Sequence, residues 1–216
     1  MEERHDTNLV TRAVIFAAEA HDGAVRKGTK LPYIVHPMEA AAITAGLTDD
    51  QEVIAAAVLH DTVEDTPATR EQIEEEFGAR VADLVAAESE NKREDQAAEL
   101  TWKIRKRETI EHLRHCTDRN VKTLALADKL SNLRAIYRDY RSIGDKLWSR
   151  FNQNDPAEIG WYYGSFVDVC LELEGTTAYE EYKELIKKTF GEIIQLTSPK
   201  IVQTDMVYCS RKEKET

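Results

Sequence analysis

A group of acidic and imidazole side chains stands at the end of one apolar stretch of the sequence. Residues 51–65, QEVIAAAVLHDTVED, begin almost wholly apolar and then present His60, Asp61, Glu64 and Asp65. The spacing predicts one helix on which positions 60 and 64 share a face, as do 61 and 65. Acids at a helix C-terminus meet the negative end of the helix dipole, and a bound cation would remove that penalty. The segment therefore predicts a cation site, with a solvated acidic helix end as the competing interpretation.

Two side chains outside this segment also have ligand chemistry. His36 precedes Pro37, which is expected to open a helix, and such a histidine alone is more typical of a surface or capping position. Asp128 lies in KTLALADKLSNLRAIY, where an acid is costly to bury unless it is hydrogen-bonded or metal-bound. With His60 and Asp61 these residues form a nitrogen and oxygen ligand set without a thiolate. Such a set suits Mn²⁺, Fe²⁺ or Zn²⁺ with open positions for water, and argues against a structural cysteine-type zinc site.

Helical periodicity predicts the elements that position these residues, and we find no alternating strand pattern. Thr66 and Pro67 end the helix that carries His60, and Thr69 with Gln72 predicts a capping box for the next helix. The expected helices span residues 9–21, 38–47, 51–65, 69–77, 79–90, 100–115, 120–140, 156–173 and 178–195, and the expected loops span residues 22–37 and 88–98. The prediction is one all-α domain over residues 1–198, followed by a C-terminal tail over residues 199–216.

Composition narrows the class of protein further. The chain has 216 residues, 42% of them apolar, and a formal net charge of −11, which suits a folded protein that repels nucleic acid and anionic membranes. A local basic pocket for a small phosphorylated ligand stays compatible with that charge. Cys116, Cys170 and Cys209 have no CxxC spacing, and no apolar run is long enough to cross a bilayer. We therefore expect a cytoplasmic protein with no nucleic-acid or membrane partner.

Basic and aromatic side chains elsewhere give weaker evidence. Arg26 and Lys27 lie in a loop, where solvated charges are the default interpretation. The exposed face of an amphipathic helix is the default interpretation of Lys103 and Lys106, and contact with a distal phosphate is the less favoured alternative. Tyr162 is more typical of packing, with a ribose or phosphate contact as the alternative. Three later residues are interpreted as structural: Asp139, Tyr140 and Asp168.

The order of these residues carries a resemblance to a known family. A histidine, then His60-Asp61, then a distant helical Asp128 resembles the HD-domain metal-dependent phosphohydrolases, which are helical bundles. The segments AHDGAVRKGTKLPYIVHPMEAA, AAAVLHDTVEDT, FGARVADLV and LALADKLSNLRAI are similar to successive motifs of the hydrolase domain of RelA/SpoT-type alarmone enzymes. The likeness covers residues 9–140, is nearest to the small standalone hydrolases, and leaves residues 141–198 as late helices without motif evidence. No synthetase-type region is expected to follow.

The resemblance implies a (p)ppGpp 3′-pyrophosphohydrolase, which releases pyrophosphate and leaves GDP or GTP. It implies that Glu64 and Asp65, the acids of an HDxxED motif, orient or activate the attacking water. The implied metal ligands, usually for Mn²⁺ with Fe²⁺ and Zn²⁺ as alternatives, are His36, His60, Asp61 and Asp128. The implied substrate contacts are Arg26, Lys27, Asn132 and Arg134, and Lys103 and Tyr162 are further candidates.

The sequence departs from the alarmone pattern near the expected nucleotide pocket. Gly28 follows Arg26-Lys27 where the long enzymes have serine, LVAAESE replaces LVxGVTK, and DKLSNLRA replaces DRLHNMRT. These departures leave open whether the base is guanine or adenine. Two other functions also stay open: a phosphatase acting on NADPH or a nucleoside monophosphate, and a non-catalytic alarmone-binding module. The oligomeric state is open too, with a homodimer among the alternatives.

Overall fold

Several helices begin where the sequence supplies a side chain that accepts hydrogen bonds from the first turn. The computed structural model describes residues 8–90, 93 and 96–197. The predicted capping box is present: Thr69 and Gln72 bond each other's backbone N–H at the start of α5 (Arg70–Phe77). At the start of four other helices an N-cap side chain accepts one backbone hydrogen bond, without a capping box, and these residues are Asn8, Asp50, Asp118 and Asp155.

The remaining elements follow the predicted order, with bounds shifted by a few residues. In chain order they are α1 (Leu9–Ala20), α2 (Val35–Ala45), α3 (Gln51–Leu59), α4 (Thr62–Asp65), α5, α6 (Ala79–Glu88), α7 (Ala98–His115), α8 (Arg119–Ile143), the 3₁₀ helix η1 (Gly144–Arg150), α9 (Pro156–Val169), the 3₁₀ turn η2 (Leu171–Leu173) and α10 (Thr177–Thr197). Within the described part of the chain there is no strand, only an isolated bridge between Val25 and Pro32. The all-α prediction is confirmed.

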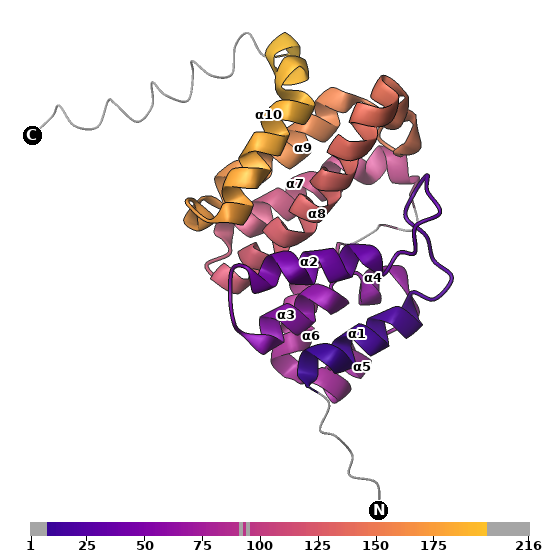
Figure 1. Cartoon of the computed structure of the whole chain (residues 1–216), viewed down its shortest axis with the longest axis vertical. Helices are drawn as coiled ribbons and strands as arrows, with labels where there is room; N and C mark the ends of the chain where they lie inside the picture. Colours follow the sequence, from indigo (N-terminus) through magenta and orange to yellow (C-terminus); the bar gives the residue numbers. More distant parts are fainter. Residues whose placement is uncertain (1–7, 91–92, 94–95, 198–216) are drawn as a thin grey trace, which may run out of the picture.

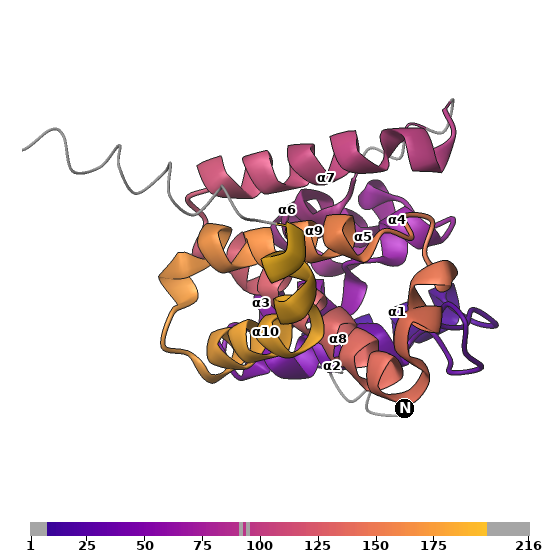
Figure 2. The same ribbon diagram turned by 90° about the horizontal axis from the view of Figure 1, so that it is seen from above.

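The long helix α8 lies between two groups of helices. On one side it contacts α2, α3 and α6, and on the other it contacts α9, α10 and η1. In Figure 1 the early helices fill the lower part of the view and the later helices the upper part. Figure 2 shows α7 lying along the outer edge of the molecule. Because α8 touches both groups, a side chain on it can complete a site that begins on α2 or α3.

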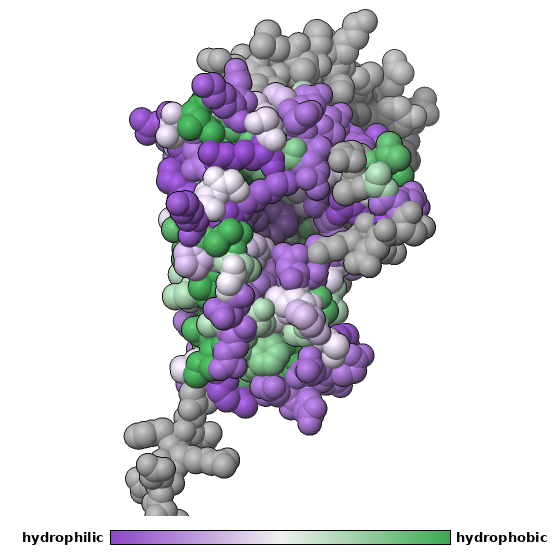
Figure 3. Space-filling view, turned by 90° about the vertical axis from the view of Figure 1, so that its right-hand side faces the viewer, coloured by the Kyte–Doolittle hydropathy of each residue, from purple (hydrophilic) through white to green (hydrophobic). Residues whose placement is uncertain are grey.

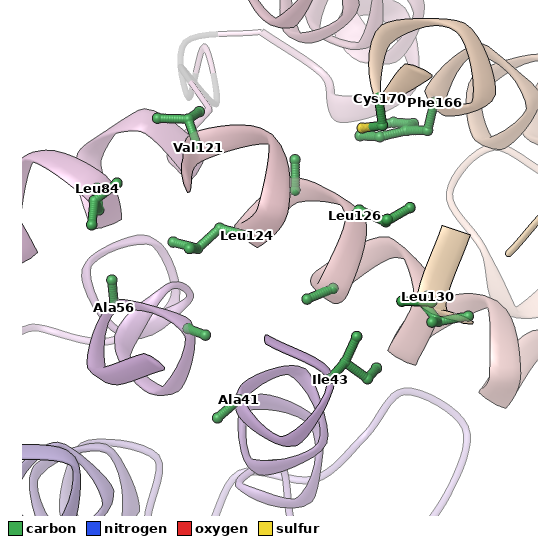
Figure 4. Packing of buried hydrophobic residues seen from close by; sticks show 14 of the residues in the cluster. Ala41, Ile43, Ala56, Leu84, Val121, Leu124, Leu126, Leu130, Phe166 and Cys170 are labelled. Carbon is green, nitrogen blue, oxygen red and sulfur yellow. The ribbon is translucent and has the colours of Figure 1, made fainter. Parts of the chain in front are cut away.

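Burial of apolar side chains holds this arrangement. Helix α3 is buried from Val53 to Leu59, which is why its sequence is almost wholly apolar. On α8, Leu124 points toward Ala56 and Leu84 of the early helices, and Leu126 points to the opposite side (Figure 4). The core is therefore continuous across α8, and burial of this kind is the main favourable contribution to folding.

The sequence prediction of one helix over residues 51–65 is wrong at the position that matters most. The helix is interrupted at His60 and Asp61, and Asp61 takes φ −90° and ψ −5° before the short α4 begins. Neighbours in a continuous helix diverge by about 100° around the axis. His60 and Asp61 both keep right-handed helical angles, with φ −55° and ψ −39° at His60, and their side chains nevertheless approach each other, with His60 Nε2 3.1 Å from Asp61 Oδ2.

Two further expectations concern the membrane and the cysteines. Within the described residues, every helix is too short or too polar to cross a bilayer. Cys116 and Cys170 are free thiols, and Cys170 is buried. Cys209 and the predicted tail over residues 199–216 lie outside the described residues, as does residue 198.

The central position of α8 makes a stability prediction. Leu130 is fully buried on α8, so Leu130→Ala is expected to lower the free energy of unfolding by about 2–5 kcal/mol, measured by urea denaturation. The matched control is Leu100→Ala on α7, where the leucine is 78% exposed and a change below about 0.5 kcal/mol is expected. Equal effects of the two substitutions would contradict this account of the core.

Candidate metal centre

Two imidazoles and two carboxylates converge between α2, the α3–α4 junction and α8. The Nε2 atom of His36 lies 3.4 Å from Asp61 Oδ2 and 3.1 Å from Asp128 Oδ1. The Nε2 atom of His60 lies 3.1 Å and 3.6 Å from the same two oxygens. Ligand atoms of His36, His60 and Asp128 all lie within 4.8 Å of one another, and these three residues are buried. The four predicted ligands are thus brought to one point.

The hydrogen bonds of His60 indicate which of its nitrogens is free to bind. Its Nδ1 lies 2.8 Å from the carbonyl oxygen of Ala57, which can only accept, so Nδ1 carries a proton. In the neutral imidazole the other nitrogen, Nε2, then presents a lone pair. Among the described residues this buried Nε2 atom has no hydrogen-bond partner, although the carboxylate oxygens of Asp61 and Asp128 lie near it. A lone pair facing carboxylates is repulsive unless a cation or a proton lies between them.

A relay of hydrogen bonds that joins His36, Ser131 and Glu39 fixes the orientation of the His36 ring. Ser131 Oγ donates to Glu39 Oε2 at 2.8 Å, because a carboxylate only accepts. The serine proton is then used, and His36 Nδ1, at 2.8 Å from the same Oγ, must be the donor. His36 Nε2 therefore also presents a lone pair to the centre. Outer partners of this kind orient metal-binding histidines in proteins.

The charges of the four groups depend on one another. Burial raises the pKa of Asp128, but Lys129 and the two imidazoles lower it more, so it lies well below its ordinary value. Asp61 behaves likewise, with His60 as the main opposing charge, and its pKa is also well below the ordinary value. Burial lowers the pKa of His60, and Asp61 and Asp128 reverse that effect, so its pKa lies well above the ordinary value. Both carboxylates are therefore ionised at neutral pH, and a divalent cation would compete with the proton on His60.

Lys129 and Asn132 hold the carboxylate of Asp128. Lys129 Nζ donates to Oδ2, and Asn132 Nδ2 donates to Oδ1 at 2.6 Å. The side-chain oxygen of Asn132 in turn accepts from Arg26 at 2.6 Å, which ties the basic loop to the centre. Arg26 is thus linked to Asp128 through Asn132. Lys129 carries no motif signal of its own and was missed by sequence reasoning.

Tyr33 holds the carboxylate of Asp61 by a hydrogen bond, and the sequence analysis did not identify it. Its hydroxyl donates to Asp61 Oδ2 at 2.6 Å and lies 3.1 Å from Asp65 Oδ2. Burial and then Asp61 raise the pKa of Tyr33 far above its ordinary value, so the hydroxyl stays protonated and remains a donor. The ring of His21 lies against that of Tyr33, with centroids 4.8 Å apart. Tyr33 stands three residues before His36 in PYIVHP, and that proximity is the only sequence signal that could have found it.

The two acids of the ED pair lie on α4 beside the centre. Asp65 is exposed and reaches Tyr33, whereas Glu64 is half-buried and accepts a long hydrogen bond from the backbone N–H of Glu90 at 3.4 Å. The two acids of α4 therefore have different neighbours, Tyr33 for Asp65 and the backbone of Glu90 for Glu64.

Two cavities open next to the centre and share part of their lining. The first has a volume of about 280 Å³ and contains Arg26 and Lys27 of the basic loop, Asn132 of α8, and apolar walls. The second has a volume of about 270 Å³ and is lined by three lysines, Lys27, Lys106 and Lys129, and by Tyr162 and Tyr163. On the face shown in Figure 3 the surface is hollowed near its middle, and hydrophilic residues surround the hollow.

Tyr162, for which the sequence left a ribose or phosphate contact as the alternative, lines the second cavity. It is 4% exposed, and its hydroxyl oxygen is buried without a hydrogen-bond partner. The ammonium group of Lys106 lies 4.8 Å from the centroid of its ring. Lys106, which the sequence offered as the alternative to Lys103, is thus the lysine of α7 that lines a cavity.

The other two predicted substrate residues are not among those lining either cavity. Lys103 Nζ bonds Glu158 and lies 3.7 Å above the ring of Trp161. Arg134 donates to Glu39 at 3.0 Å and to both oxygens of Glu181 at 2.6 and 2.7 Å. Arg134 therefore holds Glu39, and through it the Ser131 and His36 relay, because its donors are taken up by two acids.

The chain is similar in sequence and in fold to known proteins. A family model described as "HD domain" matches residues 13–153. A protein of Danio rerio named guanosine-3′,5′-bis(diphosphate) 3′-pyrophosphohydrolase MESH1 is 42% identical over 180 residues, which cover 82% of this chain and 91% of that protein. Two solved structures have similar folds. A metazoan orthologue of SpoT, which hydrolyses ppGpp and plays a role in starvation responses, has a TM-score of 0.67 and 26% identity over 84% of this chain and 96% of its own. A Listeria monocytogenes protein has a TM-score of 0.63 and 34% identity over 72% and 99% of the two chains.

The relay to His36 makes a prediction about metal affinity. Ser131→Ala removes the acceptor for His36 Nδ1–H, so Mn²⁺ affinity measured by isothermal titration calorimetry is expected to fall by about 10- to 100-fold. Ser142→Ala, at an exposed position of the same helix, is the matched control and should bind Mn²⁺ like the unmodified protein. The relay has no part in metal binding if both variants give the same dissociation constant.

Proposed function

This chain belongs to the HD domain family, and from that membership we propose that it is a Mn²⁺-dependent hydrolase that removes the 3′-pyrophosphate of (p)ppGpp-type alarmones. One observation carries the proposal: the Nε2 atoms of two imidazoles face two carboxylates, beside two cavities lined by basic side chains. The named activity of the Danio rerio relative, which matches most of both chains, supports the choice of substrate.

The donor set fits a divalent metal ion. The residues that would hold it are His36, His60, Asp61 and Asp128. Their Nε2 and carboxylate oxygen atoms converge, and when the imidazoles are neutral none of these atoms carries a hydrogen. Nitrogen and oxygen ligands of this kind suit Mn²⁺, with Fe²⁺ and Zn²⁺ as alternatives. A divalent ion bound there would polarise a phosphoryl oxygen and lower the pKa of a water molecule.

Glu64 and Asp65 are proposed to handle the attacking water. A carboxylate within hydrogen-bond reach can take the proton that the water loses as it attacks phosphorus. Asp65 Oδ2 lies 3.1 Å from the Tyr33 hydroxyl, which donates to Asp61, so the single hydroxyl proton is within reach of either carboxylate. Glu64 lies on the same short helix and is the second candidate base.

The second cavity is suited to phosphate groups. Lys27, Lys106 and Lys129 line it, and clustered cations stabilise the charge of a transferred phosphoryl group and of pyrophosphate. The buried hydroxyl of Tyr162 can donate a hydrogen bond and has no acceptor among the described residues, so a phosphate oxygen is its proposed acceptor. Asn132 and Lys27 line both cavities, and the ribose is therefore proposed to lie between them.

The first cavity is suited to the nucleoside. Its walls combine apolar side chains with a few polar groups, the usual character of a small-molecule site. The apolar members are Leu31, Val35, Ala135, Ile136, Leu147 and Phe151. A purine would bury its faces there while Arg26 and Lys27 lie near the phosphates.

The test combines product identification with a variant of the ED pair. Purified protein with Mn²⁺ is expected to release pyrophosphate from ppGpp or from its adenine analogue. Asp65→Asn is expected to lower kcat by about 10²- to 10⁴-fold while Mn²⁺ still binds, because a general base is lost and the metal ligands stay. Asp49→Asn, at an exposed position before α3, is the control and should keep full activity.

The outcomes separate the three functions considered. Orthophosphate released from NADPH or a nucleoside monophosphate, with no pyrophosphate from either alarmone, would make the protein a different HD-domain phosphatase. Nucleotide binding without any turnover, in protein shown to hold Mn²⁺, would make it a binding module. Either result overturns the proposal.

A further inference from the structure

The first cavity extends along α8 away from the metal centre. Asp128, Asn132 and Asp139 follow one another on this helix at intervals that keep them near one face. The eleven residues from Asp128 to Asp139 span about 16 Å along the axis. A nucleotide whose 3′-phosphate lies at the centre can therefore present its base to the Asp139 end. Both Asn132 and Asp139 line the cavity, which makes the two ends parts of one space.

At that end Asp139 is paired with Arg150. Arg150 donates through one terminal nitrogen to Asp139 Oδ2 at 2.9 Å, and Arg138 Nε lies 3.3 Å from the other oxygen, Oδ1. The side chain of Asp139 is 23% exposed and that of Arg150 is 28% exposed, so a ligand in the cavity can touch both. Each carboxylate oxygen has two lone pairs and uses one of them on an arginine, which leaves acceptor capacity for a ligand.

The position of Arg150 is fixed from two sides. Trp148, two residues earlier in η1, is buried between Tyr140 of α8 and Phe190 of α10, with ring centroids 5.4 and 5.6 Å away. On the opposite side the side chain of Arg150 lies over Gly28: a Cβ atom at Gly28 would stand 2.7 Å from Arg150 Cδ. Gly28 also has φ +73°, a conformation that favours glycine. The glycine that departs from the alarmone pattern is thus the residue that lets Arg150 close over the basic loop.

The chemistry of this pair suits guanine better than adenine. The Watson–Crick edge of guanine carries two adjacent donors, N1–H and the 2-amino group, beside the O6 acceptor. A carboxylate can accept from both donors while a neighbouring guanidinium donates to O6. Adenine offers the carboxylate at most one donor, its 6-amino group, and has a lone pair at N1 instead of a hydrogen. Bidentate pairs of this kind discriminate strongly between bases.

From this geometry we propose that Asp139, positioned by Arg150, selects guanine over adenine by binding the donor edge of the base. The inference deepens the proposed function and rests on it, since it assumes a purine nucleotide in the first cavity. The apolar side chains of Ile136, Leu147 and Phe151 bury the base faces, and these groups do not distinguish one purine from the other. Selection therefore depends on the charged pair.

The test compares two bases in binding and in turnover. The Mn²⁺-loaded protein is expected to bind GDP more tightly than ADP by on the order of 10- to 100-fold, and to show a kcat/KM preference of similar size for ppGpp over ppApp. Asp139→Asn keeps the shape of the side chain but replaces one acceptor by a donor, so the preference is expected to fall to about threefold or less. Arg150→Gln is expected to reduce the preference as well, because Asp139 loses its positioning partner.

The ratio between the two bases is the deciding quantity. A residue with a structural role alone would change GDP and ADP binding by the same factor and leave the ratio intact. Equal binding of GDP and ADP by the unmodified protein overturns the inference, and so does an unchanged ratio in a folded Asp139→Asn variant, with folding checked by its melting temperature. Because binding is measured without turnover, a failure to release pyrophosphate would sink the proposed function, while the GDP-to-ADP ratio would still decide the role of Asp139.

Discussion

Four electron-pair donors buried at one point are the constraint on which the rest of the structure depends. The Nε2 atoms of His36 and His60 both face the carboxylates of Asp61 and Asp128, and the remaining nitrogen of each imidazole is already committed as a donor. Such a set repels itself unless a cation joins it, so its burial is costly without a ligand. The surrounding residues make sense as the supports of this arrangement.

Helix α8 supplies several of these supports, and it links them to other elements of the fold. It supplies Asp128 to the centre and Ser131 to the relay behind His36, while Arg134 on the same helix reaches Glu181 of α10. The late part of the chain therefore contributes to the metal centre through α10 and to the first cavity through η1. A substitution far along the sequence can alter metal affinity by this route without touching a ligand.

Much of this could be predicted from the sequence, because the signals are local. Apolar periodicity located the helices within a few residues, and the Thr69 capping box is a short-range pattern. The candidate ligands could be singled out because an acid in an apolar helix, such as Asp128, is unusual. The break at His60-Asp61 could not be predicted, since neither residue is a helix breaker and both keep right-handed helical angles in the structure. Tyr33 and Lys129 were missed because their role depends on distances across the fold.

Anomalous diffraction from crystals grown with Mn²⁺ tests the central claim most directly. The account predicts one manganese peak bonded, at roughly 2.1 Å, by Nε2 of His36 and of His60 and by oxygens of Asp61 and Asp128. At a saturating concentration of Mn²⁺, a site without a peak, or a peak bound by other residues, would contradict it.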